Sequence, residues 1–291
     1  MLETLDLKKS LSKNAYARQM PELQEKLRRL QYAAQQAEIP VVICLEGWDT
    51  AGKGRVIKKL MEKLDPRLFR VYPGAAPSPL EQRYHFLWRY QSRLPNDGEM
   101  ALFDHSWYGR VLVERCDKLA RKKEWRAAYE HINQFERWLA DDGQVLIKFW
   151  MHISKKEQKA RYKESLRDPM LRWKITREYK RHHRQYDKWV EAVEEMLART
   201  STPHAPWTVV ESNDMRWARV RLFQTIVQRI EEAVERRKAQ PTLVSRTAAA
   251  RAANQAAREA RAKSDIALAR EEEKKTTAET ATAVKPKAAA S

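Results

Sequence analysis

The chain has few cysteines, no long apolar run and no internal repeat. Two cysteines in 291 residues are too few for a disulfide framework or a cysteine-based zinc site. No segment approaches the roughly 18 apolar residues that a membrane-spanning helix needs. Acids and lysines occupy the beginning of the chain, where an export signal would be apolar. We therefore expect a soluble, cytoplasmic protein that is not exported and does not span a membrane.

Negative charge is scarce as well. Lys and Arg outnumber Asp and Glu by 57 to 39, and the formal net charge is +18 at pH 7. This excess favours a polyanionic partner, such as nucleic acid, an anionic membrane or a phosphate polymer, and it does not choose among them. It is concentrated in residues 155–188, which contain 13 basic and five acidic side chains.

Short apolar segments alternate with helical patterns along the first 239 residues. We expect five strands, at residues 41–45, 69–72, 100–103, 145–153 and 208–210. We expect helices beginning at Pro21, over 56–64, 78–94 and 125–140, and from the last strand to about 237. This alternation predicts an α/β fold with a doubly wound parallel five-stranded sheet, whose ligands bind beyond the carboxyl ends of the strands.

Three regions follow from the same patterns. Residues 1–38 are predicted to be a helical lead-in packed on the core, and residues 39–239 the α/β domain. Residues 240–291 are rich in Ala, Lys and Glu and lack aromatic residues, so we expect a disordered tail.

A glycine-rich loop follows the first predicted strand and reads Gly47-Trp48-Asp49-Thr50-Ala51-Gly52-Lys53-Gly54. Backbone N–H groups in such a loop, the N-terminus of the next helix and a lysine ammonium bind phosphate. The predicted phosphate ligands are therefore Gly47, Ala51, Gly52, Lys53 and Gly54. The usual pattern places a magnesium-binding hydroxyl after the lysine, but this chain has Gly54 there and an acid, Asp49, inside the loop. An ordinary strand-turn-helix is the alternative interpretation.

Asp104 ends the third predicted strand, about fifty residues after Lys53. A strand-end carboxylate facing a phosphate loop holds magnesium in many phosphotransferases. We therefore predict that Asp49 and Asp104 bind Mg2+. The alternative is that Asp104 only caps the following helix.

Arg110 and Glu114 follow at i,i+4 on a predicted helix entered through Ser106. They could form a simple surface ion pair. The functional interpretation places Arg110 on a phosphate, and Gly109, Arg110 and Glu114 beside a nucleotide.

The basic segment, about 154–190, has a break at Asp168-Pro169, which predicts two basic helices that cover the glycine loop as a lid. Arg161, Arg167 and Lys174 would bind phosphate there, with Arg161 acting in catalysis. The interleaved aromatic residues could stack on bases, but their spacing favours a buried helix face. Adjacent His182 and His183 lack the spacing of a helical metal pair, and we expect no chemistry from them.

These motifs together resemble the second polyphosphate kinase family, over almost all of residues 5–234. The resemblance depends on the glycine loop with the preceding Glu46, on residues 103–115, on Asp168-Pro169 with Trp173-Lys174, and on Ala205-Pro206-Trp207. Residues 72–77 and 198–202 are most similar to the active half of polyphosphate:AMP phosphotransferases.

The resemblance implies a thymidylate-kinase-like P-loop core, Mg2+ and a basic lid. Asp49, Lys53, Asp104, Arg110, Glu114 and Arg161 lie at matching positions. The family usually has Arg after the strand-end Asp, whereas this chain has His105, whose neutral imidazole would bind phosphate more weakly at pH 7.

The predicted function is phosphoryl transfer from inorganic polyphosphate to AMP, giving ADP, by a homo-oligomer with neither nucleic acid nor a membrane as partner. One alternative is transfer to ADP or GDP. Another is a basic protein that binds nucleic acid or polyphosphate without any transfer activity.

Overall fold

The computed structural model describes residues 2–172, 175 and 177–239. The predicted tail, 240–291, lies outside the described residues. Residues Met1–Arg236 group into one compact unit, so the predicted lead-in shares a unit with the α/β core. Of the described helices, none is both long and apolar enough to cross a bilayer.

Five parallel strands form one sheet in the order β2-β3-β1-β4-β5. Their bounds are β1 (Val41–Gly47), β2 (Phe69–Pro73), β3 (Met100–Asp104), β4 (Val145–His152) and β5 (Trp207–Glu211). Every residue of β1 and β4 is buried, as expected for central strands covered on both faces. The prediction of a doubly wound, five-stranded parallel sheet is confirmed.

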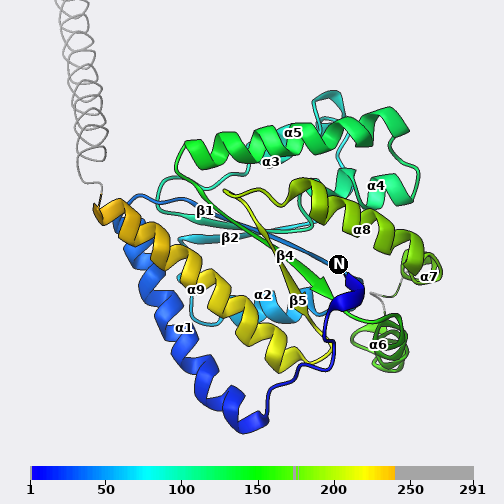
Figure 1. Cartoon of the computed structure of the whole chain (residues 1–291), viewed down its shortest axis with the longest axis horizontal. Helices are drawn as coiled ribbons and strands as arrows, with labels where there is room; N and C mark the ends of the chain where they lie inside the picture. Colours follow the sequence, from blue (N-terminus) through cyan, green and yellow to red (C-terminus); the bar gives the residue numbers. More distant parts are fainter. Residues whose placement is uncertain (1, 173–174, 176, 240–291) are drawn as a thin grey trace, which may run out of the picture. The chain divides into compact units, whose positions relative to one another are not determined.

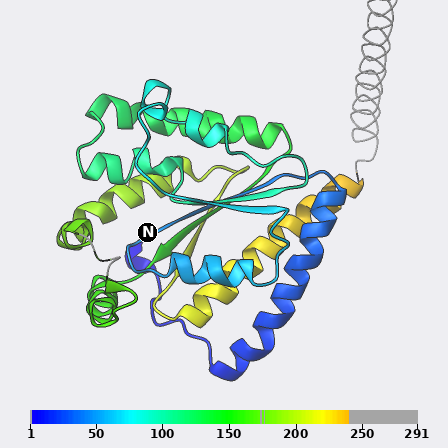
Figure 2. The ribbon, with the colours of Figure 1, turned by 180° about the vertical axis from the view of Figure 1, so that it is seen from behind.

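Helices cover both faces of the sheet (Figures 1 and 2). One face carries α1 (Lys13–Gln36), α2 (Lys53–Met61) and α9 (Met215–Ala239). The other carries α3 (Trp88–Gln91), α4 (Val113–Cys116), α5 (Lys122–Asp141) and α8 (Tyr186–Thr200). Short 3-10 helices are η1 (Leu2–Thr4), η2 (Glu81–Arg83) and η3 (Trp107–Arg110).

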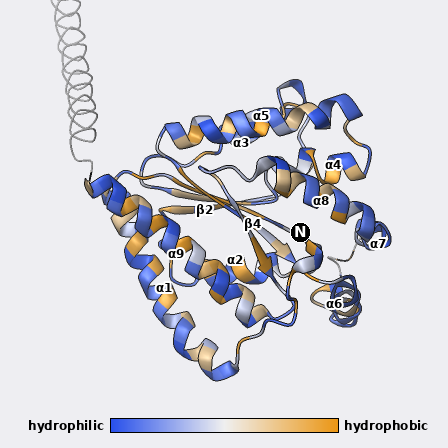
Figure 3. Cartoon of the chain, viewed as in Figure 1, coloured by the Kyte–Doolittle hydropathy of each residue, from blue (hydrophilic) through white to orange (hydrophobic). Residues whose placement is uncertain are grey.

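The two basic helices lie apart from these layers. Helices α6 (Lys155–Arg167) and α7 (Arg177–Arg184) follow β4 and lie beyond the tip of its arrow in Figure 1. Figure 3 shows them coloured mostly hydrophilic, in contrast to the apolar β4. Helix α8 packs on α5 and buries Trp189 at 8% exposure. Tyr186 is equally buried, so for these two aromatic side chains the predicted core role is confirmed.

The helix that was expected to begin at Pro21 begins earlier. Its N-cap is Ser12, whose side chain accepts a hydrogen bond from the Ala15 amide, and Pro21 lies inside α1. Proline lacks an N–H group and so leaves one helical bond unmade, but it does not stop this helix. The buried face, which includes Met20, Leu27 and Ala34, holds α1 on the core.

The continuous helix expected over 78–94 is wrong. Ser78 and Glu81 do form the predicted reciprocal cap, at 2.8 and 3.2 Å. Tyr84 then adopts an extended conformation that ends η2, and its ring stacks on Trp88 with 4.4 Å between centroids. The reciprocal cap therefore begins only one short 3-10 helix and not the longer helix that it predicted.

Candidate active site

The sheet topology brings the two predicted motifs to the same edge. Strands β1 and β3 are parallel neighbours, and Leu45 pairs with Asp104. The glycine loop leaves β1 just beyond this level, so both motifs lie at the carboxyl ends of adjacent strands. This is the edge at which sheets of this kind bind ligands.

Two glycines shape the loop. Gly47 has φ +150°, and a Cβ there would lie 2.6 Å from the Met151 carbonyl oxygen. Gly52 has φ +104° and is the N-cap of α2, in a conformation that L side chains rarely adopt. The loop therefore turns directly into the positive end of α2, where backbone N–H groups can bind an anion.

Lys53 is the first residue of α2 and is buried. Its Nζ donates to the carbonyls of Gly47 at 2.8 Å and Trp48 at 3.3 Å, so the ammonium is held across the mouth of the loop. At Gly54 a Cβ would meet nothing within 4 Å. Packing would therefore tolerate the hydroxyl side chain that the usual loop pattern has there.

Arg161, on α6, fastens this loop to the end of β5. Its guanidinium donates to the carbonyls of Thr50 at 3.1 Å and Ala51 at 3.2 Å. It also donates to Ser212 and Asn213, at 2.6 and 2.8 Å. These four acceptors give Arg161 a positioning role for the loop, and a contact with a transferring phosphate stays a prediction.

Asp49 lies against a histidine of helix α7. His182 Nδ1 is 2.9 Å from Asp49 Oδ2, and its Nε2 is 3.2 Å from Asp117 Oδ2. Burial opposes ionisation of Asp49, but the bond to His182 and the charge of Lys53 lower the pKa of this carboxyl. Burial likewise opposes protonation of His182, yet Asp49 and Asp117 raise its pKa above the ordinary value. Asp49 is therefore a carboxylate at neutral pH.

Asp104 has the properties of a metal ligand. Its Oδ1 is buried and has no hydrogen-bond partner among the described residues. The N-cap of η3 is Ser106, so Asp104 does not cap the following helix. Tyr179 of α7 lies near both carboxylates: burial, and then the charges of Asp49 and Asp104, raise its pKa to about 12. Both carboxylates therefore lie near the Tyr179 hydroxyl.

Magnesium fits this donor set. Mg2+ prefers oxygen ligands and is commonly bound through one or two carboxylates together with substrate phosphates. Within the described part of the chain, no group of three or more His, Cys, Asp and Glu side chains is arranged to hold a metal by itself. Asp104, with its buried oxygen that has no described partner, and the ionised Asp49 would supply two such carboxylates.

His105, at the position where the resemblance leads us to expect Arg, turns toward Glu46. Its Nδ1 is 3.4 Å from Glu46 Oε2, and half of its side chain is exposed. Glu46 also accepts from the amide and hydroxyl of Ser106, at 2.6 and 2.9 Å. The buried Glu46 therefore fixes the turn after β3, and a phosphate contact by the exposed edge of His105 stays a prediction.

The predicted helix after Ser106 is divided into η3 and α4, because Leu112 between them leaves helical geometry. Arg110 still reaches Glu114, at 2.9 Å, and its guanidinium lies 4.8 Å from the Phe86 ring centre. Burial raises the pKa of Glu114, and Arg110 opposes the shift. The pair is partly buried at the edge of the site, and the predicted roles of Gly109, Arg110 and Glu114 toward nucleotide stay predictions.

Two further phosphate ligands, Arg167 and Lys174, were predicted in the basic segment. Arg167 ends α6 and is exposed to solvent. Lys174 lies outside the described residues. Their contact with a phosphate chain therefore stays a prediction.

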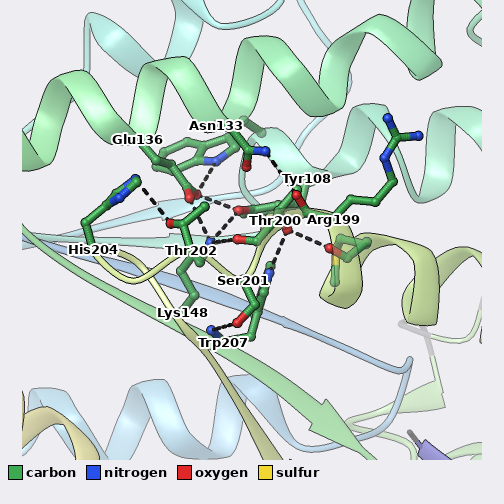
Figure 4. Close-up of polar contacts among 12 residues, drawn as sticks. Tyr108, Asn133, Glu136, Lys148, Arg199, Thr200, Ser201, Thr202, His204 and Trp207 are labelled. Atoms are coloured by element: carbon green, nitrogen blue, oxygen red, sulfur yellow. Dashed lines mark hydrogen bonds and ion pairs between the residues drawn. The ribbon is translucent and has the colours of Figure 1, made fainter.

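A fully buried polar network holds η3 against the sheet (Figure 4). Lys148 Nζ, on β4, donates to Glu136 at 2.7 Å, to the Tyr108 hydroxyl at 2.8 Å and to the Thr200 carbonyl at 2.7 Å. Glu136 also accepts from Tyr108, at 2.6 Å, and from Trp107, at 3.0 Å. Burial lowers the pKa of Lys148, and the Glu136 carboxylate opposes the shift. Because Trp107 and Tyr108 belong to η3, this network fixes the segment between Asp104 and Arg110.

A second buried histidine supports the glycine loop. His152 Nδ1 accepts from the indoles of Trp48, at 3.2 Å, and Trp150, at 3.3 Å. Trp48 in turn stacks on Tyr186 with 4.2 Å between ring centres. Burial lowers the pKa of His152 to about 4, so the imidazole is neutral and its Nδ1 remains an acceptor.

This histidine gives a prediction for stability. Between pH 6.5 and 4 the unfolded chain binds a proton at His152 that the folded chain does not, so stability falls as the pH falls. Unfolding in urea at pH 7 and pH 5 should show that the unsubstituted protein loses about 2 kcal/mol more than His152→Asn. The asparagine amide keeps an acceptor but does not titrate. Parallel losses in the two proteins would contradict this account of His152.

Several residues at this site were missed by the sequence interpretation. His182 was assigned no chemistry and Asp117 was not singled out. Glu46 was named only for the family resemblance, and Tyr179 belonged to the interleaved aromatic residues for which a core role was expected. No local spacing marks them, because each meets its partner across the fold; His182 and Asp49 are 133 positions apart.

Known proteins share this sequence and fold. The sequence model of the family described as polyphosphate kinase 2 matches residues 10–238. A polyphosphate:AMP phosphotransferase of Pseudomonas aeruginosa is 41% identical over 238 residues, which are 82% of this chain and 48% of that protein. An ADP-polyphosphate phosphotransferase of the same organism is 37% identical over 228 residues, 78% of this chain and 75% of that protein.

Two solved structures agree with the fold. A crystal structure of a Pseudomonas aeruginosa protein described as a polyphosphate kinase 2 has a TM-score of 0.79 at 41% identity, and the match covers 81% of this chain and 51% of that one. Polyphosphate kinase 2 from Arthrobacter aurescens has a TM-score of 0.75 at 28% identity, with coverage of 80% and 86%. This chain spans about half the length of the AMP phosphotransferases that it matches. With the family model matching most of its length, the chain belongs to the polyphosphate kinase 2 family.

Proposed function

We propose that this chain transfers a phosphoryl group from inorganic polyphosphate to AMP, with Mg2+ bound by Asp49 and Asp104. The observation that carries the proposal is the identity of 39–44% to three proteins named polyphosphate:AMP phosphotransferase. The relatives named for ADP match at 34–37%. AMP is therefore the acceptor that we favour, and ADP or GDP is the alternative.

The site chemistry agrees with this reaction. Phosphoryl transfer needs positioning and charge stabilisation more than covalent chemistry from the protein. An oxygen of the AMP phosphate forms a bond to the terminal phosphorus of polyphosphate while that phosphorus loses its bridging oxygen. The products are ADP and a polyphosphate shorter by one unit. No protein nucleophile is needed.

Each residue has a defined task in this proposal. The loop amides and Lys53 bind the oxygens of the phosphoryl group, at the positive end of α2. Arg161 holds the loop in position through hydrogen bonds to four carbonyl oxygens. Bound Mg2+ would neutralise charge on the donor and acceptor phosphates. Arg110, which is partly buried beside Glu114, would stabilise an acceptor phosphate.

The choice of acceptor can be tested directly. The full chain would be incubated with Mg2+, polyphosphate and, separately, AMP, ADP or GDP, and the products separated by chromatography. We expect ADP from AMP at the highest initial rate. A higher rate with ADP or GDP would show that this nucleotide is preferred to AMP as the acceptor. The absence of a nucleotide product from all three would overturn the proposal.

The lid charge leads to a prediction about salt. Binding of a polyanion releases condensed counterions, so affinity for long polyphosphate should fall steeply with salt. Arg167→Gln should reduce the slope of log affinity against log salt by about one, the value expected for one lost phosphate contact. Arg28→Gln, an exposed arginine of α1, is the matched control and should leave the slope unchanged.

Double-stranded DNA distinguishes the basic-protein alternative. A general basic surface should bind the duplex with a similar slope, whereas a site built for a single phosphate chain should bind it weakly. Equal slopes for Arg167→Gln and Arg28→Gln would contradict a role of Arg167 in polyphosphate binding. The predicted homo-oligomer can be checked by light scattering on the same samples.

A further inference from the structure

His182 connects the lid to the metal-binding loop. It lies on α7, and its ring is held between two carboxylates that come from other elements. Nδ1 is 2.9 Å from Asp49 Oδ2 and Nε2 is 3.2 Å from Asp117 Oδ2, with only 12% of the side chain exposed. A ring contact with Trp189, 4.6 Å between centres, covers it further.

The Asp117 carboxylate is itself held in place by its surroundings. It is the C-cap of α4, its side chain is 6% exposed, and its amide donates to the Val113 carbonyl at 2.8 Å. Arg181, next to His182, donates to both oxygens of Asp117, with Nε 3.1 Å from Oδ1. Such a bidentate pair fixes geometry as well as charge. The Asp117 carboxylate therefore holds the imidazole in one orientation.

We propose that His182 is a positioning residue that orients the Asp49 carboxylate for Mg2+ through its Nδ1, with Asp117 holding the ring from behind. The inference rests on the proposed function, because it takes Asp49 as a metal ligand. Partners of this kind, which orient a ligating carboxylate or imidazole, typically contribute 10- to 100-fold to metal affinity or activity.

The arrangement couples lid and loop. The described bond from His182 to Asp49 uses Oδ2, so one contact aligns the carboxylate and leaves Oδ1 for the cation. Because His182 belongs to α7, a lid displaced from the loop would release Asp49. Metal affinity should therefore depend on a lid residue that does not itself bind the metal.

Two amide substitutions test the contacts of the two ring nitrogens separately. In His182→Asn the side-chain nitrogen lies at the position of Nδ1 and keeps a donor for Asp49. In His182→Gln the longer side chain reaches toward Asp117 and gives up the Asp49 contact. Both variants are neutral amides, so they form a matched pair.

The measurement is a titration of the full chain with Mn2+, a probe for the magnesium site, following the electron paramagnetic resonance signal of the free ion. It needs no turnover. We expect His182→Gln to weaken Mn2+ binding about 10-fold and His182→Asn to stay within about threefold of the unsubstituted protein. Thermal melting of both variants checks that they are folded.

His183→Ala is the control on the same helix, since His183 bonds Gln158 at 2.7 Å and contacts neither Asp49 nor Asp117 in the described interactions. It should keep the original Mn2+ affinity. Equal affinities for the Asn and Gln variants, tighter binding in either, or weaker binding in His183→Ala would overturn the inference. Asp104→Asn separates it from the proposed function: if that variant also binds Mn2+ as before, the metal site itself is wrong.

Discussion

Asp104→Asn and Lys53→Ala should each lower phosphoryl transfer at least about 100-fold, the effect of removing one preorganised charge from such a site. Asp104 has a buried oxygen without a described partner, and Lys53 is held across the loop by two carbonyls. Initial rates with polyphosphate, AMP and saturating Mg2+ would measure the loss.

Both variants should remain folded, because neither side chain belongs to the apolar core. Asp142→Asn, at an exposed turn before β4, is the control for the loss of one carboxylate and should keep the full rate. A rate close to that of the unsubstituted protein in either Asp104→Asn or Lys53→Ala would remove these two motifs from the active site.

Lys148→Met should reduce the free energy of unfolding by about 3–5 kcal/mol, because it leaves the Glu136 carboxylate buried without its cation. Both side chains of this pair are fully buried. Unfolding in urea would measure the effect. We expect the double variant with Glu136→Gln to be more stable than Lys148→Met alone, since the uncompensated charge is then removed.

The exposed Arg137–Asp141 ion pair provides the contrast, since it lies on α5 like Glu136. Its two side chains are 65% and 60% exposed. Arg137→Ala should therefore cause no measurable change in the free energy of unfolding. If Lys148→Met were as stable as Arg137→Ala, the buried network would not be what holds η3 against the sheet.

The sheet, and the meeting of the two candidate motifs at one of its edges, could be predicted because their signals are local. The strands are short, unbroken apolar segments, and a glycine loop with a lysine between a strand and a helix is typical of a phosphate site. Parallel strands end at one edge, so Asp104 could be expected beside the loop without knowledge of any side-chain contact.

Contacts between distant segments could not be predicted. Arg161 was expected to bind phosphate as a lid residue, but the carbonyls that surround it come from two loops 50 or more positions away. The helix expected over 78–94 is interrupted at Tyr84, whose backbone is extended, and the reciprocal cap at Ser78 does not indicate this break. His182 was dismissed on spacing, since sequence alone does not show that Asp49 and Asp117 lie on either side of it.

The most direct measurement of the central claim follows the phosphorus itself. The full chain would be incubated with radiolabelled polyphosphate, Mg2+ and unlabelled AMP, beside the Lys53→Ala variant. We expect label in ADP, its loss when a chelator removes the metal, and at least about 100-fold less label with the variant. Unlabelled nucleotide in every reaction, or equal labelling by the variant, would contradict it.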